Sequence, residues 1–267
     1  MLVTDKKYYM EKDLVTNLDF LLERNKKGWD NVLILDGEER SGKTTLGKQI
    51  GYYLNFKKKK NFTVDNIHFC PEEMFDYAME QRQEVIMWDE AALGAMSEDR
   101  YKQSQQLIIK MLMTAGKYNH NYIFIIPKIR KLSDYIAEDR SIALLRVKSL
   151  NNIDRGFFDL FGKKKKNLIS QFERKKQKYF TKRDMRGRFF SYENTDKEVI
   201  DLAAYEQKKD NAIKSIINQD KKKKSYQIYF KKLVEHIKKN KLMTYKEVAG
   251  LIDKDASFIS RLARETE

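Results

Sequence analysis

Hydrophobic and polar positions alternate along the first 150 residues in a pattern that predicts buried strands separated by amphipathic helices. Short runs rich in Val, Ile and Phe are typical of strands, whereas apolar residues at every third or fourth position indicate helices. The expected strands cover residues 32–35, 67–70, 84–88, 122–126 and 143–147. The expected helices lie within residues 1–31 and over residues 45–54, 71–83, 103–117 and 132–138. This alternation predicts an α/β fold with a parallel sheet.

The pattern weakens after residue 162. Residues 163–194 show no clear period, and we expect an irregular stretch with a hairpin over residues 178–192 that turns near Gly187. Thr195-x-x-Glu198 has the spacing of a capping box, which predicts the start of a helix that continues to about residue 218.

The strand over residues 32–35 runs directly into a glycine-rich loop. Gly37 is followed by four residues and then by Gly42-Lys43-Thr44, which is the G-x-x-x-x-G-K-[ST] spacing of a Walker A phosphate loop. Glycines let successive backbone N–H groups point at phosphate oxygens, and the N-terminus of the following helix favours an anion. We expect Lys43 to reach the β- and γ-phosphates of ATP and Thr44 to bind Mg²⁺. The alternative is a glycine turn that happens to carry a lysine.

Two carboxylates, Asp89 and Glu90, follow the apolar run over residues 84–88. The carboxyl ends of parallel strands lie at one edge of the sheet, so both acids are expected beside the nucleotide. Asp89 fits the Walker B residue that holds Mg²⁺, usually through water, and Glu90 fits the base that orients and activates the attacking water. The alternative is that both acids cap a following helix.

The strand over residues 122–126 is expected to lie between the phosphate-loop strand and its neighbours. Such an inserted strand is the mark of the additional-strand class of P-loop NTPases. Lys128 lies at its carboxyl end, where such enzymes carry a polar sensor. The residues expected to bind ATP are Gly37, Arg40, Ser41, Gly42, Lys43, Thr44, Thr45 and Lys128.

Composition and charge restrict the cellular compartments and the binding partners that we expect. Cys70 is the single cysteine, and no apolar run is long enough to span a membrane, which predicts a cytoplasmic protein without membrane contact. Residues 1–150 carry 24 Lys and Arg against 22 Asp and Glu, whereas residues 151–267 carry 30 against 17, so most of the net charge of +15 lies in the second part. This excess favours a polyanion such as nucleic acid or acidic lipid, and the alternative is a solvated lysine-rich surface.

Several segments match one known family when they are taken together. The matching series is Gly37…Gly42-Lys43-Thr44, Trp88-Asp89-Glu90-Ala91, Ile125-Ile126-Pro127, Leu132…Tyr135-Ile136…Arg140-Ser141, Leu145…Val147 and Arg155-Gly156-Phe157-Phe158. This series, over about residues 30–162, resembles the FtsK/HerA-type ATPases, and among them those of phages and mobile elements with a zonular occludens toxin domain. Tyr205-Glu206 and Lys208-Lys209 resemble the closing helix of that family.

The resemblance implies a ring-forming motor on DNA, with six or five copies of the chain. It also implies that an arginine from a neighbouring subunit completes each ATP site. Arg140 is the best match for that arginine.

The lysine run at residues 221–224 predicts a boundary between a domain over residues 1–220 and a small all-α domain over residues 221–267. Helices over residues 226–239, 244–249 and 257–262 resemble a helix-turn-helix unit, and the capping box Thr244-x-x-Glu247 begins the second of them. The side chains expected in the major groove of DNA are those of Ser257, Ser260 and Arg261. A protein-binding helical adaptor is the alternative.

The activity expected from these features is the ATP-driven movement or packaging of duplex DNA by a ring in a mobile element or virus. A regulator or loader that uses ATP as an assembly switch is the alternative, and it would hydrolyse ATP slowly and move nothing. A small-molecule kinase would need a substrate pocket and a lid, and the sequence shows no motif for either.

Overall fold

A seven-stranded sheet lies at the centre of the unit Met1–Ile213 in the part of the chain that the structure describes. The computed structural model describes residues 2–3, 8–89, 98–150, 153–177, 181–190, 199–239, 243–251, 255, 257 and 259. The strands in spatial order are β4 (Ile67–His68), β5 (Val85–Asp89), β6 (Asn121–Ile125), β3 (Asn31–Gly37), β7 (Ala143–Leu150), β8 (Asp154–Gly162) and β9 (Met185–Arg188). The strands from β4 to β7 in this order are parallel, β8 is antiparallel to β7, and β9 is antiparallel to β8. This mostly parallel sheet confirms the α/β prediction.

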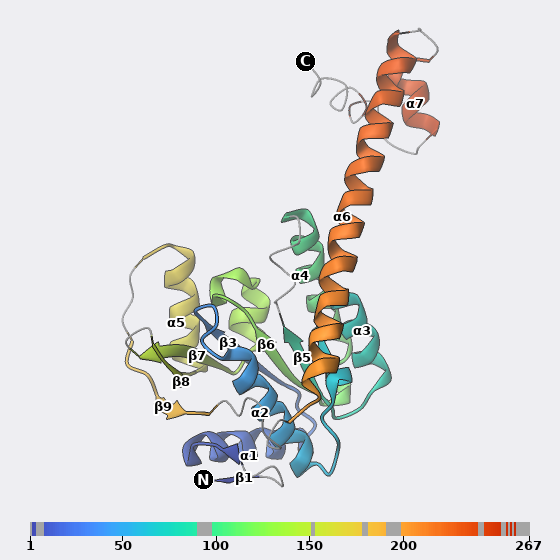
Figure 1. Ribbon diagram of the computed structural model, residues 1–267. Coiled ribbons are helices and arrows are strands. Elements are labelled where there is room, and N and C mark those ends of the chain that lie inside the picture. Colours follow the sequence, from blue (N-terminus) through green and yellow to red (C-terminus); the bar gives the residue numbers. More distant parts are fainter. Residues whose placement is uncertain are drawn as a thin grey trace. The chain divides into compact units, whose positions relative to one another are not determined.

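Strand β6 lies between β3 and β5, the position that the sequence predicts for residues 122–126 (Figure 1). Leu35 of β3 and Asp89 of β5 both pair with Ile125 of β6. The residues that follow β3 and the end of β5 therefore meet at one edge of the sheet.

Helices cover both faces of the parallel strands, which explains the continuous apolar runs within them, such as Val32–Leu35 in β3 and Val85–Trp88 in β5. Helix α2 (Lys43–Lys57) covers one face, and its Gly47 lies against Ile125 and Met87. A side chain at Gly47 would approach the Ile125 Cδ1 atom to 2.8 Å, so this glycine lets the helix lie close to the sheet. Helix α1 (Lys12–Lys26) packs on α2 and β3.

The opposite face carries an extended apolar core. Trp88 and Phe124 are fully buried there, with ring centroids 5.8 Å apart. They pack against α3 (Pro71–Glu80), α4 (Glu98–Thr114) and the buried Ile136 and Ile169. The helix predicted over residues 132–138 is replaced by a 3₁₀ turn, Ile129–Lys131, and a short π-helix, Tyr135–Arg140.

The structure corrects the reading of residues 163–194. Helix α5 (Lys163–Arg174) occupies part of the stretch that the sequence predicted to be irregular. The prediction failed because four consecutive lysines at the start of the helix obscure its periodicity, although Lys166 and Ile169 are buried. The predicted turn at Gly187 is wrong, because this residue lies within β9 and pairs with Phe158 of β8. A Cβ atom at Gly187 would lie 2.3 Å from the Phe158 ring, so the glycine serves close packing.

Most described residues of the unit Lys214–Glu267 are helical. Helix α6 (Leu202–Lys239) continues through the lysines at residues 221–224, where the sequence predicted a break, and α7 spans Tyr245–Leu251. Val234, Val248, Ala249 and Ile259 form a small buried cluster. The predicted capping box is confirmed, since Glu247 accepts from the Thr244 N–H at 2.7 Å while its own N–H donates to the Thr244 hydroxyl at 3.3 Å. No helix among the described residues has both the length and the apolar character that a bilayer crossing needs.

Candidate functional site

The loop after β3 has the backbone geometry of a tight turn into a helix. Gly37 has a φ of +140°, and a Cβ atom there would lie 1.9 Å from the carbonyl oxygen of Val147, so the position accepts only glycine. Gly42 has a φ of +99° and caps the N-terminus of α2. The first N–H groups of a helix have no acceptor within it, so the loop ends at a site that favours an anion.

Lys43, the first residue of α2, folds back over this loop. Its Nζ atom donates to the carbonyl oxygens of Gly37 at 2.9 Å and Glu38 at 2.6 Å. The hydroxyl of the buried Ser41 also donates to the Glu38 carbonyl, at 2.8 Å. These bonds close the loop on itself and hold a positive charge over it.

Thr44 and Asp89 meet as the sequence predicts. The Thr44 hydroxyl donates to Asp89 Oδ2 at 2.9 Å, and the Asp89 side chain at the end of β5 is almost fully buried. A hydroxyl oxygen and a carboxylate at the N-terminus of a helix are hard ligands of the kind that Mg²⁺ uses beside a phosphate. The residues present therefore fit a magnesium ion.

Tyr205, in the first turn of α6, is a third member of this cluster that sequence reasoning did not assign. Its hydroxyl donates to Asp89 Oδ2 at 2.9 Å. Burial, together with the neighbouring Asp89 carboxylate, raises the pKa of Tyr205 well above its ordinary value, so the hydroxyl keeps its proton. The contact joins residues 116 positions apart, and only the resemblance to a closing helix pointed to this segment.

Lys128 and the loop border the same cavity, which has a volume of about 620 Å³. Its walls include Gly37, Glu39 and Lys128, and the Gly37 N–H donates to the Pro127 carbonyl at 3.3 Å. Arg40 is exposed on the loop with a φ of +58°, and Thr45 is half-buried in the first turn of α2. The structure thus brings Lys128 beside the loop.

An ion pair between the half-buried Arg146 and the buried Asp36 fixes the start of the loop. Arg146 on β7 donates from Nε and Nη2 to the two carboxylate oxygens of Asp36, at 2.9 and 2.6 Å, and from Nη2 to Glu173 at 2.8 Å. The Ile129 N–H also donates to Asp36, at 3.2 Å. Burial disfavours the charge of Arg146, but the bonds and attraction of Asp36 and Glu173 outweigh it and raise its pKa. Sequence reasoning missed this network, which joins β3, β7, α5 and the 3₁₀ turn Ile129–Lys131.

We expect Arg146→Met to lower the free energy of unfolding by about 3 kcal/mol, because it leaves the carboxylate of Asp36 buried and unpaired. Urea denaturation of the full chain measures this loss. Adding Asp36→Asn removes the buried charge and keeps an acceptor for the Ile129 N–H, so the double variant should recover part of the loss. A loss below about 1 kcal/mol for Arg146→Met would mean that this ion pair stabilises the fold no more than an exposed ion pair does.

Arg140 lies away from the loop in the same chain. It forms an ion pair with Asp30 and donates to the Leu112 carbonyl at 3.2 Å. Asp30 directly precedes β3, so this pair lies at the end of the strand opposite to the loop. The structure therefore separates Arg140 from Lys43 and Asp89 within one subunit, and its role toward a neighbour stays a prediction.

The other predicted residues lie outside the site or outside the described residues. Glu90, Ser260 and Arg261 lie outside the described residues. Ser257 is exposed in a helical position of the unit Lys214–Glu267.

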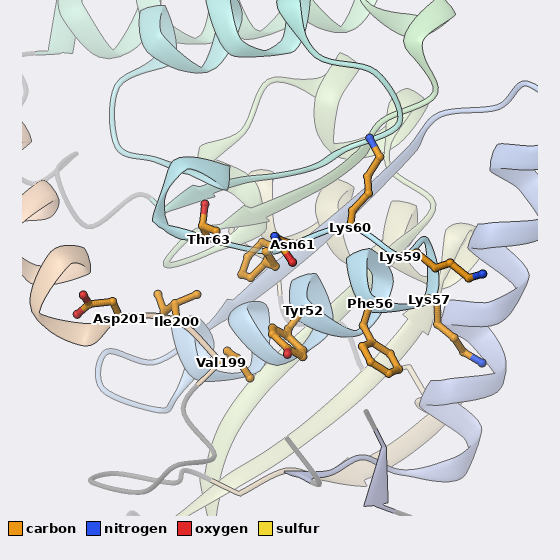
Figure 2. Close-up of a pocket in the computed structure, with 11 residues that line it drawn as sticks. Tyr52, Phe56, Lys57, Lys59, Lys60, Asn61, Thr63, Val199, Ile200 and Asp201 are labelled. Atoms are coloured by element: carbon orange, nitrogen blue, oxygen red, sulfur yellow. The ribbon is translucent and has the colours of Figure 1, made fainter. Parts of the chain in front are cut away.

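A second cavity, of about 740 Å³, lies at the other end of α2, between Tyr52, Phe56 and Ile200 (Figure 2). The neighbouring lysines are partly neutralised, since Lys60 pairs with Glu84 at 2.7 Å and Lys57 lies 3.8 Å from Asp19. In Figure 2 the side chains of Lys57, Lys59 and Lys60 point in different directions rather than toward one centre. At this end of α2, therefore, the charged side chains do not converge on one point as the polar groups around the loop do.

Comparison of the chain with models of known protein families gives no match, and no curated protein matches it in sequence. The resemblance to the FtsK/HerA-type ATPases therefore stays a prediction. The geometry of the loop, Thr44 and Asp89 is the main support for a function.

Proposed function

We propose that this protein is an ATP hydrolase of the additional-strand P-loop class that moves or packages duplex DNA as a ring. The observation that carries the proposal is the hydrogen bond between Thr44, which follows the glycine loop, and Asp89 at the end of β5. It joins the two segments that a P-loop NTPase uses for phosphate and metal, and β6 lies between their strands.

The residues of the loop have distinct roles in this proposal. The N–H groups at the start of α2 and the Lys43 ammonium bind the β- and γ-phosphates, and Thr44 and Asp89 hold Mg²⁺. Magnesium, when bound, neutralises charge on the β- and γ-phosphate oxygens. Glu90 directly follows Asp89 and orients and deprotonates the attacking water.

The cavity beside the start of the loop is large enough for a ligand bigger than a phosphate ion, although Lys43, Thr44 and Asp89 are not among its lining residues. Its volume of about 620 Å³ lies within the range of about 300–1,000 Å³ that is usual for small-molecule sites. Lys128 on its wall contacts the γ-phosphate in this proposal.

Duplex DNA is the proposed substrate because of the charge of the second part of the chain and the resemblance to ring-forming motors. Residues 151–267 carry 30 Lys and Arg against 17 Asp and Glu. Ser257, Ser260 and Arg261 read the major groove, while lysines elsewhere contact phosphates without regard to sequence. Arg140 of one subunit completes the ATP site of the next in a hexameric or pentameric ring.

We expect the purified full chain to hydrolyse ATP only with Mg²⁺, faster with duplex DNA, and to displace the third strand of a DNA triplex. Phosphate release and triplex displacement measure these activities, with single-stranded DNA and an ATP analogue that resists hydrolysis as controls. The DNA affinity should fall steeply with salt, because binding releases counterions. ATP-dependent DNA binding without strand displacement would favour the assembly switch, and no Mg²⁺-dependent nucleotide binding would exclude both functions.

A further inference from the structure

The Asp89 Oδ2 atom accepts hydrogen bonds from two hydroxyl groups, those of Thr44 and Tyr205, each at 2.9 Å. A hydroxyl has one proton and two lone pairs. While the Thr44 hydroxyl donates its hydrogen bond to Asp89, the lone pairs on its oxygen point away from that carboxylate and can act as ligands of a cation. The orientation of Thr44 as a ligand therefore depends on where the Asp89 carboxylate is held.

The Tyr205 side chain is itself firmly placed. It is 4% exposed, and its ring lies 5.5 Å from the ring of Phe69. The Lys48 ammonium, one turn after Thr44 on α2, lies over the Tyr205 ring at 5.0 Å. A ring on α6 that contacts α2 and Phe69, the residue after β4, gives the hydroxyl a fixed position, and a hydrogen bond to a carboxylate is among the stronger ones.

We infer that Tyr205 is a positioning residue that fixes Asp89, and through it Thr44, so that the pair holds a divalent cation tightly. This inference rests on the proposed function, since it assigns Mg²⁺ to Thr44 and Asp89. Tyr205 acts through the carboxylate and does not touch the cation. Residues of this kind around metal sites typically change metal affinity by about 10- to 100-fold.

The test is the binding of a fluorescent ATP analogue by the full chain at increasing Mg²⁺ concentrations. We expect Tyr205→Phe to raise the half-saturating Mg²⁺ concentration about 10-fold, while analogue binding in EDTA stays unchanged. Phe69→Leu keeps the hydroxyl but loosens the ring, so it should shift the concentration in the same direction by less. In an Asp89→Ala background, Tyr205→Phe should add no further shift, because the carboxylate through which it acts is gone.

Tyr53→Phe is the matched control, because the Tyr53 hydroxyl donates to Asp19 at 2.6 Å and so also loses a bond to a carboxylate. Its half-saturating Mg²⁺ concentration should equal that of the parent chain. The inference is overturned if Tyr205→Phe shows the parent Mg²⁺ dependence, or if both variants shift it equally. A parent chain whose analogue binding does not respond to Mg²⁺ would overturn the proposed function as well, so the two failures are distinguishable.

Discussion

Replacing Lys43 with alanine will weaken ATP binding by about 100-fold or more. The Lys43 ammonium lies over the loop, bonded to the carbonyl oxygens of Gly37 and Glu38, and it is positioned to neutralise the phosphates as they bind. Its removal takes away a charge-assisted hydrogen-bond donor in a partly buried site, where such bonds are strongest. Titration of the full chain with ATP and Mg²⁺ in a calorimeter measures the affinity.

Lys57→Ala is the control for the loss of a positive charge on the same helix. Lys57 is exposed in the last turn of α2, far along the helix from the loop, and its nearest acid is Asp19 at 3.8 Å. Its affinity for ATP should match that of the parent chain. If Lys43→Ala bound ATP as tightly as Lys57→Ala did, the phosphate-loop assignment would be wrong, and the glycine turn would remain as the explanation of the motif.

The central strands and the loop were predictable from the sequence because their signals are local. Strand β3 contains the continuous apolar run Val32–Leu35 and ends at Gly37, and the positive φ of Gly37 and Gly42 matches the need for glycine at those two positions. The meeting of Thr44 and Asp89 followed from one rule, that the carboxyl ends of parallel strands share an edge.

The rest of the site depends on contacts between distant residues, which local patterns do not encode. The bond from Tyr205 to Asp89 spans 116 positions, and the pair of Arg146 with Asp36 spans 110. The first bond requires the position of α6 and the second requires the register of β3 against β7, neither of which a single sequence gives. Helix α5 was missed for a different reason, since its lysine-rich first turn masks a face on which Lys166 and Ile169 are buried.

Glu90→Gln will keep ATP binding and lose hydrolysis by about 100-fold or more, because glutamine has nearly the same shape but cannot take a proton from water. Since Lys43 and the loop N–H groups bind the phosphates in our proposal, affinity should change little. This is the opposite of the expectation for Lys43→Ala, so the pair of variants separates binding from chemistry. Calorimetry gives the affinity, and phosphate release at saturating ATP gives the rate.

Glu39→Gln is the matched variant for the same charge change, since Glu39 lies on the loop and lines the cavity beside it. If Glu90 is the base, Glu39→Gln should hydrolyse ATP at close to the parent rate. Parent-rate hydrolysis by Glu90→Gln, together with a large loss in Glu39→Gln, would move the base to the loop. The attacking water would then be activated from the side of the cavity that Glu39 and Lys128 share, rather than from the carboxyl end of β5.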